Sequence, residues 1–431
     1  GVGLTGPVTF LVLGFVNGLT SGFSVKVAQA FGAGDEARVR RAVGMSYLLC
    51  VAVAVVVTAV AVPLTAPLLR LMQTPSAYYD YAYWYLLIIF CGIGATVFYN
   101  IVAGLLRAVG DSRTPLYFLV AAAVLNVGLD FAFIMGCGWH YCGAALATVL
   151  SQLLSGGACL AYALYRYPVL RPARSDFGWD TRLAMGHFAV GLPMALQFSI
   201  TAIGCIVQQT ALNGLDAALP GAVTAYTAAS KIDNIANQVF VALGTALATY
   251  AGQNYGAGEF GRIRRGVLAG MVYVFAGSVI GFAFAVGLCE PLMKLFLNTD
   301  LSADVAGNYG AIIGYGRQFL LWQCSFYPFL GAIYVYRNTL QGIGRSAVTT
   351  FAGVTELAGR VLASLVFVRV WGFTGVCSSN PVAWVAAVIF LVATYAVVMR
   401  RRNNGELPRA RSRAHRRRLR RSCRIAVRRA S

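Results

Sequence analysis

Long apolar runs separated by short polar segments dominate the chain. Eleven of these runs are bounded by glycine, proline or charged residues, and each has the roughly 20 residues that a helix needs to cross a bilayer. They fall at 3–27, 43–63, 83–107, 115–136, 143–165, 187–211, 222–250, 266–289, 311–340, 347–369 and 375–399. The pattern predicts an all-α integral membrane protein whose spans are joined by short turns.

Composition supports this class and excludes others. The 431 residues are 58% hydrophobic and 12% charged, with a mean hydropathy of +0.67, whereas a soluble domain has about 25% charged residues. A soluble enzyme, a disordered chain and a secreted disulfide scaffold are therefore excluded. Cys137 and Cys142 flank a short loop with His140, where a disulfide is sterically possible, but the spacing is a weak metal signal.

The distribution of basic residues predicts the orientation. Alternate loops carry thirteen and three Lys or Arg residues, and the richer set faces the cytoplasm by the positive-inside rule. Gly1 then lies outside, and the C-terminus lies in the cytoplasm. The segment 400–431 contains fourteen Arg and one Glu, and we expect it to lie on anionic lipid rather than to bind nucleic acid.

An internal repeat organises the chain. AQAFGAGDEARVRRAV at 28–43 matches GQNYGAGEFGRIRRGV at 252–267, an offset of 224 residues, and LRAVGDS at 106–112 matches LQGIGRS at 340–346. The glycines predict tight turns between helices, since no Lys-Ser/Thr follows them as in a nucleotide loop. The second unit holds six spans and the first five, so we expect a first helix missing before residue 1 and two pseudo-symmetric six-helix bundles in the complete protein.

This repeat sets the predicted domain organisation. Residues 1–170 form an N-terminal lobe with five of six helices, and 171–186 form a cytoplasmic linker. Residues 187–399 form a C-terminal lobe of six helices, and 400–431 are an Arg-rich cytoplasmic tail.

Polar residues at membrane depth are the main functional signal, because burying an ionisable group in lipid is costly. Asn126 and Asp130 lie one helical turn apart on the span 115–136. Counting from the short outer loop places Thr148 at the depth of Asp130, and Gln152 opposite Asn126. Carboxylate, amide and hydroxyl oxygens at one level suit a small hard cation or a proton relay. A hydrogen-bonded helix contact remains the alternative.

Other charges lie within the spans as well. Glu356 and Arg360 are spaced for an i,i+4 salt bridge, and Asp233 is a further candidate polar residue of the cleft. We expect Lys231 to extend toward the membrane surface, and Lys26 and Arg337 to be interfacial anchors.

The joint order of these motifs resembles the multidrug and toxic compound extrusion (MATE) family, in its bacterial DinF-like branch. The resemblance covers about residues 3–400 and rests on the two repeats above together with LNVGLDF, GAALATVLSQ, GLPMALQ and TELAGR. It implies a V-shaped cleft between two six-helix lobes. It also implies the export of organic, often cationic, compounds in exchange for Na+ or H+.

The resemblance also implies roles for individual residues. Asn126, Asp130 and Thr148 match the family's N-lobe cation site, and would be metal ligands if the coupling ion is Na+. The family's first-helix Asp would fall in the missing segment. Acids that some branches carry in the second lobe fall at Thr201 and near Leu330 here, so we expect no cation site of that kind.

The predicted function is therefore a secondary antiporter of organic and cationic drugs in the inner membrane, as a multi-pass protein. We expect a monomer with small-molecule organic substrates, membrane lipids around it, no nucleic acid partner and no cofactor beyond the coupling ion. The alternative is a flippase for a lipid-linked precursor. Such a protein would line its cleft with many Arg and Lys residues for the pyrophosphate, and this sequence has few basic residues at membrane depth. An enzyme is not expected, because the sequence has no H-E-x-x-H and no nucleophile–base set.

Overall fold

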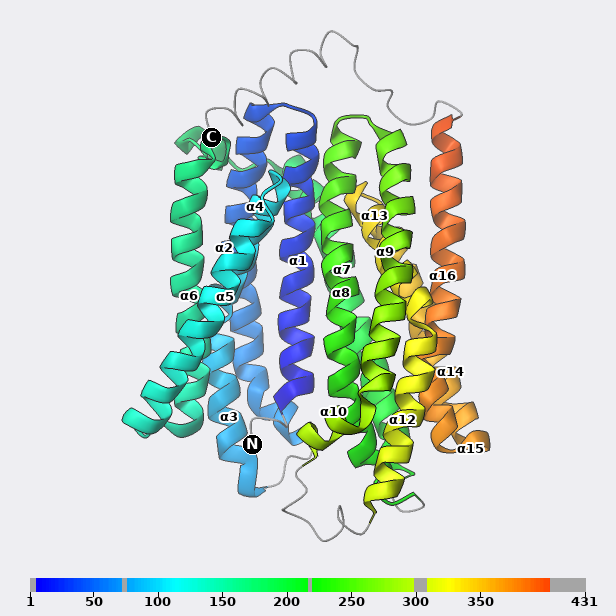
Figure 1. Cartoon of the computed structure of the whole chain (residues 1–431). Coiled ribbons are helices and arrows are strands. Elements are labelled where there is room, and N and C mark those ends of the chain that lie inside the picture. The colour runs from blue at the N-terminus through cyan, green and yellow to red at the C-terminus, as the bar shows by residue number, and fades with distance from the viewer. Residues whose placement is uncertain (1–4, 72–75, 216–218, 298–307, 404–431) are drawn as a thin grey trace.

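The computed structural model describes residues 5–71, 76–215, 219–297 and 308–403, and every regular element in these ranges is a helix (Figure 1). The first half of the chain contains α1 (Gly6–Gly32), α2 (Glu36–Leu71), α3 (Ser76–Cys91), α4 (Ile93–Ala108), α5 (Arg113–Asp130) and α6 (His140–Arg166). A π-helical segment, η2 (Phe131–Gly136), extends α5, and two short 3₁₀ turns, η3 (Pro168–Leu170) and η4 (Arg174–Phe177), follow α6.

The second half repeats this order. It contains α7 (Thr181–Asn213), α8 (Ala222–Gly256), α9 (Phe260–Gly287), α10 (Cys289–Phe296), α12 (Tyr309–Ser325), α13 (Tyr327–Gly342), α14 (Ser346–Leu362), α15 (Val368–Trp371) and α16 (Phe373–Asn403). A second π-helical segment, η5 (Ala363–Phe367), joins α14 to α15. Both halves thus place a π-helical segment after the equivalent helix, α5 or α14.

The predicted membrane spans are confirmed in the described ranges. Nine helices are by themselves long and apolar enough to cross a membrane, and the bent pairs α3–α4 and α12–α13 bring the number to eleven. The bends are 46° and 45°, and they fall at equivalent places in the two halves. Residues 1–4 and 404–431 lie outside the described residues. The predicted Arg-rich tail, 400–431, is therefore described only over its first four residues.

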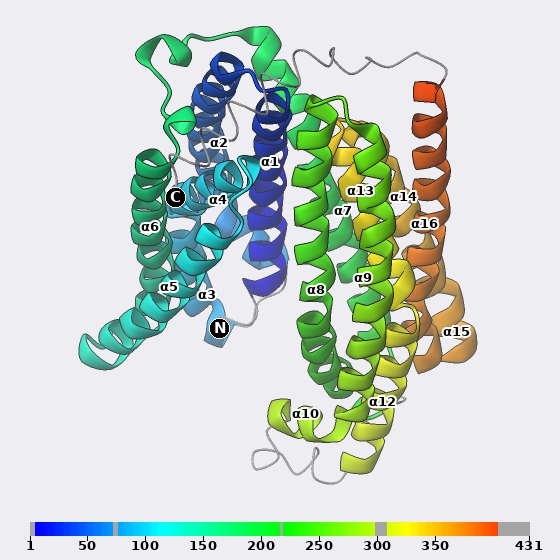
Figure 2. The same ribbon diagram turned by 45° about the horizontal axis from the view of Figure 1, so that its top comes forward.

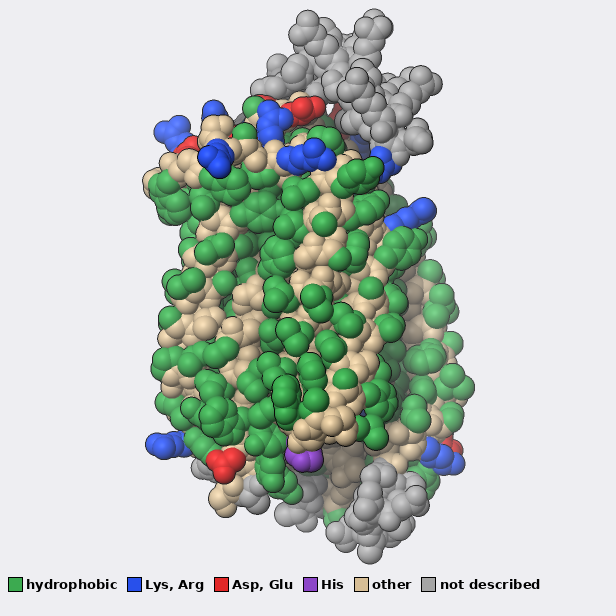
Figure 3. Space-filling view, turned by 90° about the vertical axis from the view of Figure 1, so that its left-hand side faces the viewer, with side chains coloured by type: hydrophobic (Ala, Val, Ile, Leu, Met, Phe, Trp, Pro, Cys, Tyr) green, Lys and Arg blue, Asp and Glu red, His purple; other side chains and the backbone are tan. Residues whose placement is uncertain are grey.

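The repeated glycine motif forms the predicted helix-to-helix turns. Gly34 and Gly258 have φ of 70° and 72°, a left-handed conformation that glycine adopts without steric cost. In the first copy, the Asp35 carboxylate accepts a hydrogen bond of 3.0 Å from the Arg38 backbone N–H and so caps the start of α2. Lys and Arg side chains gather at this end of the molecule, at the top of Figure 3, which we call the Arg-rich end.

Buried apolar side chains form two large clusters. One runs from Val8 to Ala195 and the other from Leu212 to Leu391, and α7 contributes to both. Helices α1 and α7 pack closely because glycines face each other: a Cβ on Gly22 would overlap the Gly191 backbone. Helix α1 therefore joins the two halves along its length, and Figure 2 shows it between α2 and α8.

Among the nine described spans that consist of a single helix, α5 is the least covered. Only 6% of the apolar stretch within 113–136 is buried, against 39% for the equivalent stretch within 346–371. The difference arises because α7 packs along α14, whereas no described helix covers the corresponding face of α5.

Candidate functional site

Asn126 and Asp130 occupy the last two turns of α5, and Asp130 directly precedes the π-helical segment η2. Asn126 Nδ2 and Asp130 Oδ1 are both inaccessible to solvent and have no hydrogen-bond partner in the described part of the chain. Asp130 lies close enough to the Tyr85 phenol of α3 for an electrostatic interaction. Buried polar atoms are nearly always paired in folded proteins, so the Asp130 carboxylate has unused capacity to bind a cation or a proton, and the Asn126 amide has an unused donor.

Thr148 lies on α6, which runs antiparallel to α5. Two contacts fix the register: Ser155 Oγ donates a 2.6 Å hydrogen bond to the Phe118 carbonyl, and a Cβ on Gly143 would lie 2.9 Å from Phe133 Cβ. Interpolation between them puts Thr148 at the level of Asn126, about one turn from the predicted level beside Asp130. The Thr148 hydroxyl donates to the Ala144 carbonyl of its own helix, leaving its oxygen able to accept.

Gln152 is shifted from its predicted level in the same direction along α5 as Thr148. It lies near the level of Ala122 rather than opposite Asn126, and its Oε1 accepts a 2.6 Å hydrogen bond from Thr96 of α4. A second pair links α4 to α1, where Asn100 Nδ2 donates to Asn17 Oδ1 at 2.6 Å. Sequence reasoning missed Asn17, Thr96 and Asn100. Their polarity within apolar runs was the available signal.

The second half does not reproduce the acid–amide pair. The offset of 234 residues between LRAVGDS and LQGIGRS makes Arg360 the counterpart of Asn126 and Ser364 the counterpart of Asp130. Ser364 is buried and its hydroxyl contacts Ser379 Oγ at 3.3 Å. Among the described residues of these two equivalent helices, a carboxylate with a buried, unpartnered oxygen therefore occurs only in the first half.

Glu356 is the centre of a buried ion cluster. The predicted pair with Arg360 forms at 3.1 Å, and Arg337 of α13 joins it at 2.7 Å. Arg337 is only 6% exposed, so its expected role as an interfacial anchor is wrong. Its position near the end of a span gave no sign of the carboxylate that α14 presents to it. Both Glu356 oxygens are paired, which makes this cluster a structural link between α13 and α14.

Asp233 of α8 is also buried and paired. Its Oδ1 accepts a 2.8 Å hydrogen bond from the Tyr327 hydroxyl and its Oδ2 accepts one of 3.0 Å from Asn237. Tyr327 is fully buried at the bend between α12 and α13, so its hydrogen bond to Asp233 links α8 to that bend. Lys231 points elsewhere, with its Nζ 5.4 Å from the centre of the Phe296 ring.

Two glutamines of the repeated motif connect the halves at the Arg-rich end. Gln29 Nε2 of α1 donates a 2.8 Å hydrogen bond to the Gly342 carbonyl of α13. Gln253 Nε2 of α8 donates a 2.9 Å hydrogen bond to the Ala108 carbonyl of α4. The glutamines are related by the offset of 224, and their acceptors by the offset of 234.

The fold and these buried polar groups define a polytopic, all-helical membrane protein of the transporter type. The MatE family profile matches residues 1–132 and 193–363, which is more than half of the chain. The chain therefore belongs to the MatE family of multidrug efflux transporters, and it is a transporter rather than an enzyme.

Individual relatives agree with this placement. A probable multidrug resistance protein, YoeA of Bacillus subtilis, is 25% identical over 411 residues, covering 92% of this chain and 85% of its own length. A FAD transporter of Shewanella oneidensis is 23% identical over 360 residues, covering 80% of this chain and 74% of its own length.

Solved structures share the fold. An outward-facing multidrug resistance MATE transporter of the MOP superfamily matches with a TM-score of 0.84 at 23% identity, covering 92% of this chain and 87% of its own. A MOP superfamily transporter of Pyrococcus furiosus matches with a TM-score of 0.83 at 23% identity, covering 92% of this chain and 88% of its own. The predicted V-shaped, two-bundle MATE architecture is confirmed at the level of the fold.

Proposed function

We propose that this protein is a secondary antiporter that exports organic, often cationic, compounds in exchange for Na+ or H+. The observation that carries the proposal is the unpartnered buried carboxylate oxygen of Asp130, Oδ1, on α5. With the Thr148 hydroxyl oxygen at the level of Asn126, the N-lobe offers the oxygen donors that a small hard cation prefers. Protonation of Asp130 would use the same carboxylate.

Transport requires the two halves to exchange arrangements, and ion binding has to favour one of them. We propose that residues 1–170 and 187–399 move as lobes joined by the linker 171–186. The hydrogen bonds of Gln29 and Gln253 hold the lobes together at the Arg-rich end in the present arrangement. Ion and drug need not touch each other, because each need only prefer a different arrangement.

Orientation and assembly belong to the same proposal. The Arg-rich end, and with it the C-terminus, faces the cytoplasm of a bacterial inner membrane, following the basic residues of the loops. The protein acts as a monomer, with small organic molecules as its substrates and no cofactor besides the coupling ion.

A flippase for a lipid-linked precursor is the alternative within this fold. Such a protein would need free basic groups at membrane depth to hold a pyrophosphate. Arg337 and Arg360 are instead paired with Glu356, and Lys231 lies over Phe296. These contacts favour the antiporter.

The test reconstitutes the full-length protein in vesicles and follows efflux of a fluorescent organic cation under an imposed Na+ gradient, then a pH gradient. We expect one gradient to drive efflux and Asp130→Asn to abolish the response. Asp80→Asn, which removes an exposed carboxylate of α3, is the matched control and should transport normally.

Normal coupled efflux by Asp130→Asn would overturn the site assignment. Absence of wild-type efflux under both gradients, with transfer of a labelled polyprenyl-pyrophosphate lipid between leaflets, would establish the flippase instead.

A further inference from the structure

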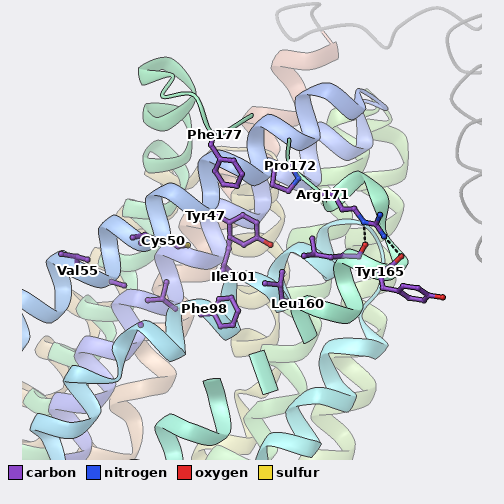
Figure 4. Close-up of a pocket in the computed structure, with 15 residues that line it drawn as sticks. Tyr47, Cys50, Val55, Phe98, Ile101, Leu160, Tyr165, Arg171, Pro172 and Phe177 are labelled. Atoms are coloured by element: carbon purple, nitrogen blue, oxygen red, sulfur yellow. Dashed lines mark hydrogen bonds between the residues drawn. The ribbon is translucent and has the colours of Figure 1, made fainter. Parts of the chain in front are cut away.

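A lateral groove opens on the N-terminal half, away from the candidate ion site. Its volume is 830 Å³, within the range of about 300–1,000 Å³ that small-molecule sites occupy. Helix α4 forms its floor and contacts both α2 and α6, which form the walls. Figure 4 shows the lining side chains, which are apolar apart from Arg171, two tyrosines and a cysteine.

The groove runs from the Arg-rich end to the middle of the membrane spans. Its mouth, at the Arg-rich end, is formed by Arg171, Pro172 and Phe177 of the segment that follows α6. Its inner limit is at Val55, near the midpoint of α2, and at Gly94, near the midpoint of the α3–α4 span. The groove therefore has the depth of one leaflet.

The walls are open toward lipid. Val51 and Val55 are 65% and 63% exposed, and Tyr165 at the mouth is exposed as well. At Gly94 a Cβ would meet nothing within 4 Å, so the floor leaves unfilled space beside α4. Within a membrane no hydrophobic force operates between apolar surfaces, so an acyl chain would bind here through close packing of its methylene groups against the groove walls.

Arg171 gives the mouth a fixed positive charge. Its Nε donates to the Leu164 carbonyl and its Nη2 donates to the Tyr165 carbonyl at 3.2 Å, which orients the guanidinium without neutralising it. The nearby acid Asp176 is occupied, since it accepts from the Ala173 N–H at 2.8 Å and lies 3.9 Å from Arg40. Arg174, three residues along the chain, is exposed at the same mouth segment.

We propose that this groove binds an anionic phospholipid of the leaflet at the Arg-rich end, with an acyl chain along α4 and the phosphate at Arg171. Basic pockets between helices at one membrane surface are typical sites for anionic headgroups. The segment 171–177 packs on α2, where a Cβ on Gly44 would lie 2.5 Å from the Asp176 carbonyl oxygen. A bound lipid would thus join α2, α6 and this segment into one unit.

The test places the purified full-length protein in nanodiscs containing equal amounts of phosphatidylglycerol and phosphatidylcholine, and counts retained lipids by native mass spectrometry. We expect one phosphatidylglycerol to be retained by the wild type. Arg171→Gln should weaken retention about fivefold, the contribution of one basic residue at an anionic surface. Gly94→Leu should abolish retention, because it fills the groove without touching the mouth.

Matched controls separate the groove from the general surface. Arg262→Gln removes an exposed charge at the same end on α9, and Gly314→Leu adds a side chain on α12, in the other half, where a Cβ meets nothing within 4 Å. Both should retain lipid like the wild type. Because Arg171→Gln also uncaps α6, Arg174→Gln provides a second charge variant with the α6 cap intact.

Two outcomes would overturn the proposal. Equal retention of phosphatidylcholine and phosphatidylglycerol by the wild type would remove the headgroup recognition. Unchanged retention by Gly94→Leu would move the lipid elsewhere on the protein. Displacement of the lipid by the fluorescent organic cation, with loss of transport in Gly94→Leu, would make the groove a drug site and contradict the proposal as well.

Discussion

Gln29 and Gln253 make equivalent hydrogen bonds in opposite directions between the two halves of the chain. Each side chain reaches the carbonyl at the end of a helix in the other half, Gly342 for Gln29 and Ala108 for Gln253. The duplicated motif thus supplies two matching attachments at one end of the molecule, and the exchange of arrangements that we propose would break both.

Alanine at either glutamine should loosen this end. A neutral hydrogen bond contributes about 1 kcal/mol, so Gln29→Ala and Gln253→Ala should each favour the separated arrangement by about fivefold. Both glutamines lie at one contact between α1 and α8, because Gly32 approaches the Gln253 carbonyl and Gly256 approaches the Gln29 carbonyl, so the double variant measures the coupling between them. Distances between spin labels at Glu36 and Arg262 measure the change, and an effect confined to one glutamine would contradict the equivalence.

The neighbouring glycines should be more sensitive. A Cβ on Gly32 would overlap the Gln253 carbonyl, and one on Gly256 would overlap the Gln29 carbonyl. Overpacking costs about 1–3 kcal/mol, so Gly32→Ala and Gly256→Ala should separate the halves at the Arg-rich end.

Gly261→Ala is the control for these glycines, because a Cβ there meets nothing within 4 Å. The same spin-label pair reports all three variants. A distance distribution for Gly32→Ala that matches the one for Gly261→Ala would show that the close approach does not limit the arrangement.

Glu356→Gln should destabilise the protein strongly. It leaves Arg337 and Arg360 buried without their carboxylate, and breaking a buried ion pair costs about 3–5 kcal/mol. Thermal unfolding in detergent measures the loss. Glu290→Gln removes a pair with Lys294 at 3.0 Å in which both side chains are more than half exposed, and it should change stability little.

Ion binding at Asp130 should also appear as stability, independently of transport. If Na+ is the coupling ion, adding it in place of K+ stabilises the folded protein by about 2.7 kcal/mol at a concentration of 100 times Kd. Asp130→Asn should lose this response while Asp80→Asn keeps it. A Na+ response that persists in Asp130→Asn would place the ion elsewhere, and a wild type indifferent to Na+ would favour proton coupling.

The sequence predicted the spans well because each is a long apolar run with clear ends. The register between α5 and α6 was harder to predict from the sequence. Counting from the outer loop assumes regular α-helix, whereas η2 is π-helical and His140 begins α6 with a φ of 40°. Thr148 therefore lies at the level of Asn126 rather than Asp130.

Contacts between distant helices were not predictable from spacing. The pairing of Glu356 with Arg360 follows from helical periodicity, but Arg337 joins them from another helix. The Tyr327 bond to Asp233 likewise joins residues 94 positions apart. The repeated Gln was visible in both motifs, and only its partner across the halves was not.

The contrast between Asp130 and its counterpart Ser364 separates two effects that mutagenesis usually confounds. Ser364 is buried and contacts Ser379 Oγ at 3.3 Å, so larger side chains there should lower protein abundance and drug resistance together. Asp130 Oδ1 has no hydrogen-bond partner among the described residues, so Asp130→Asn should keep abundance and lose drug resistance. Recording protein abundance alongside drug resistance at both positions will therefore distinguish damage to the bundle from loss of the ion-binding carboxylate.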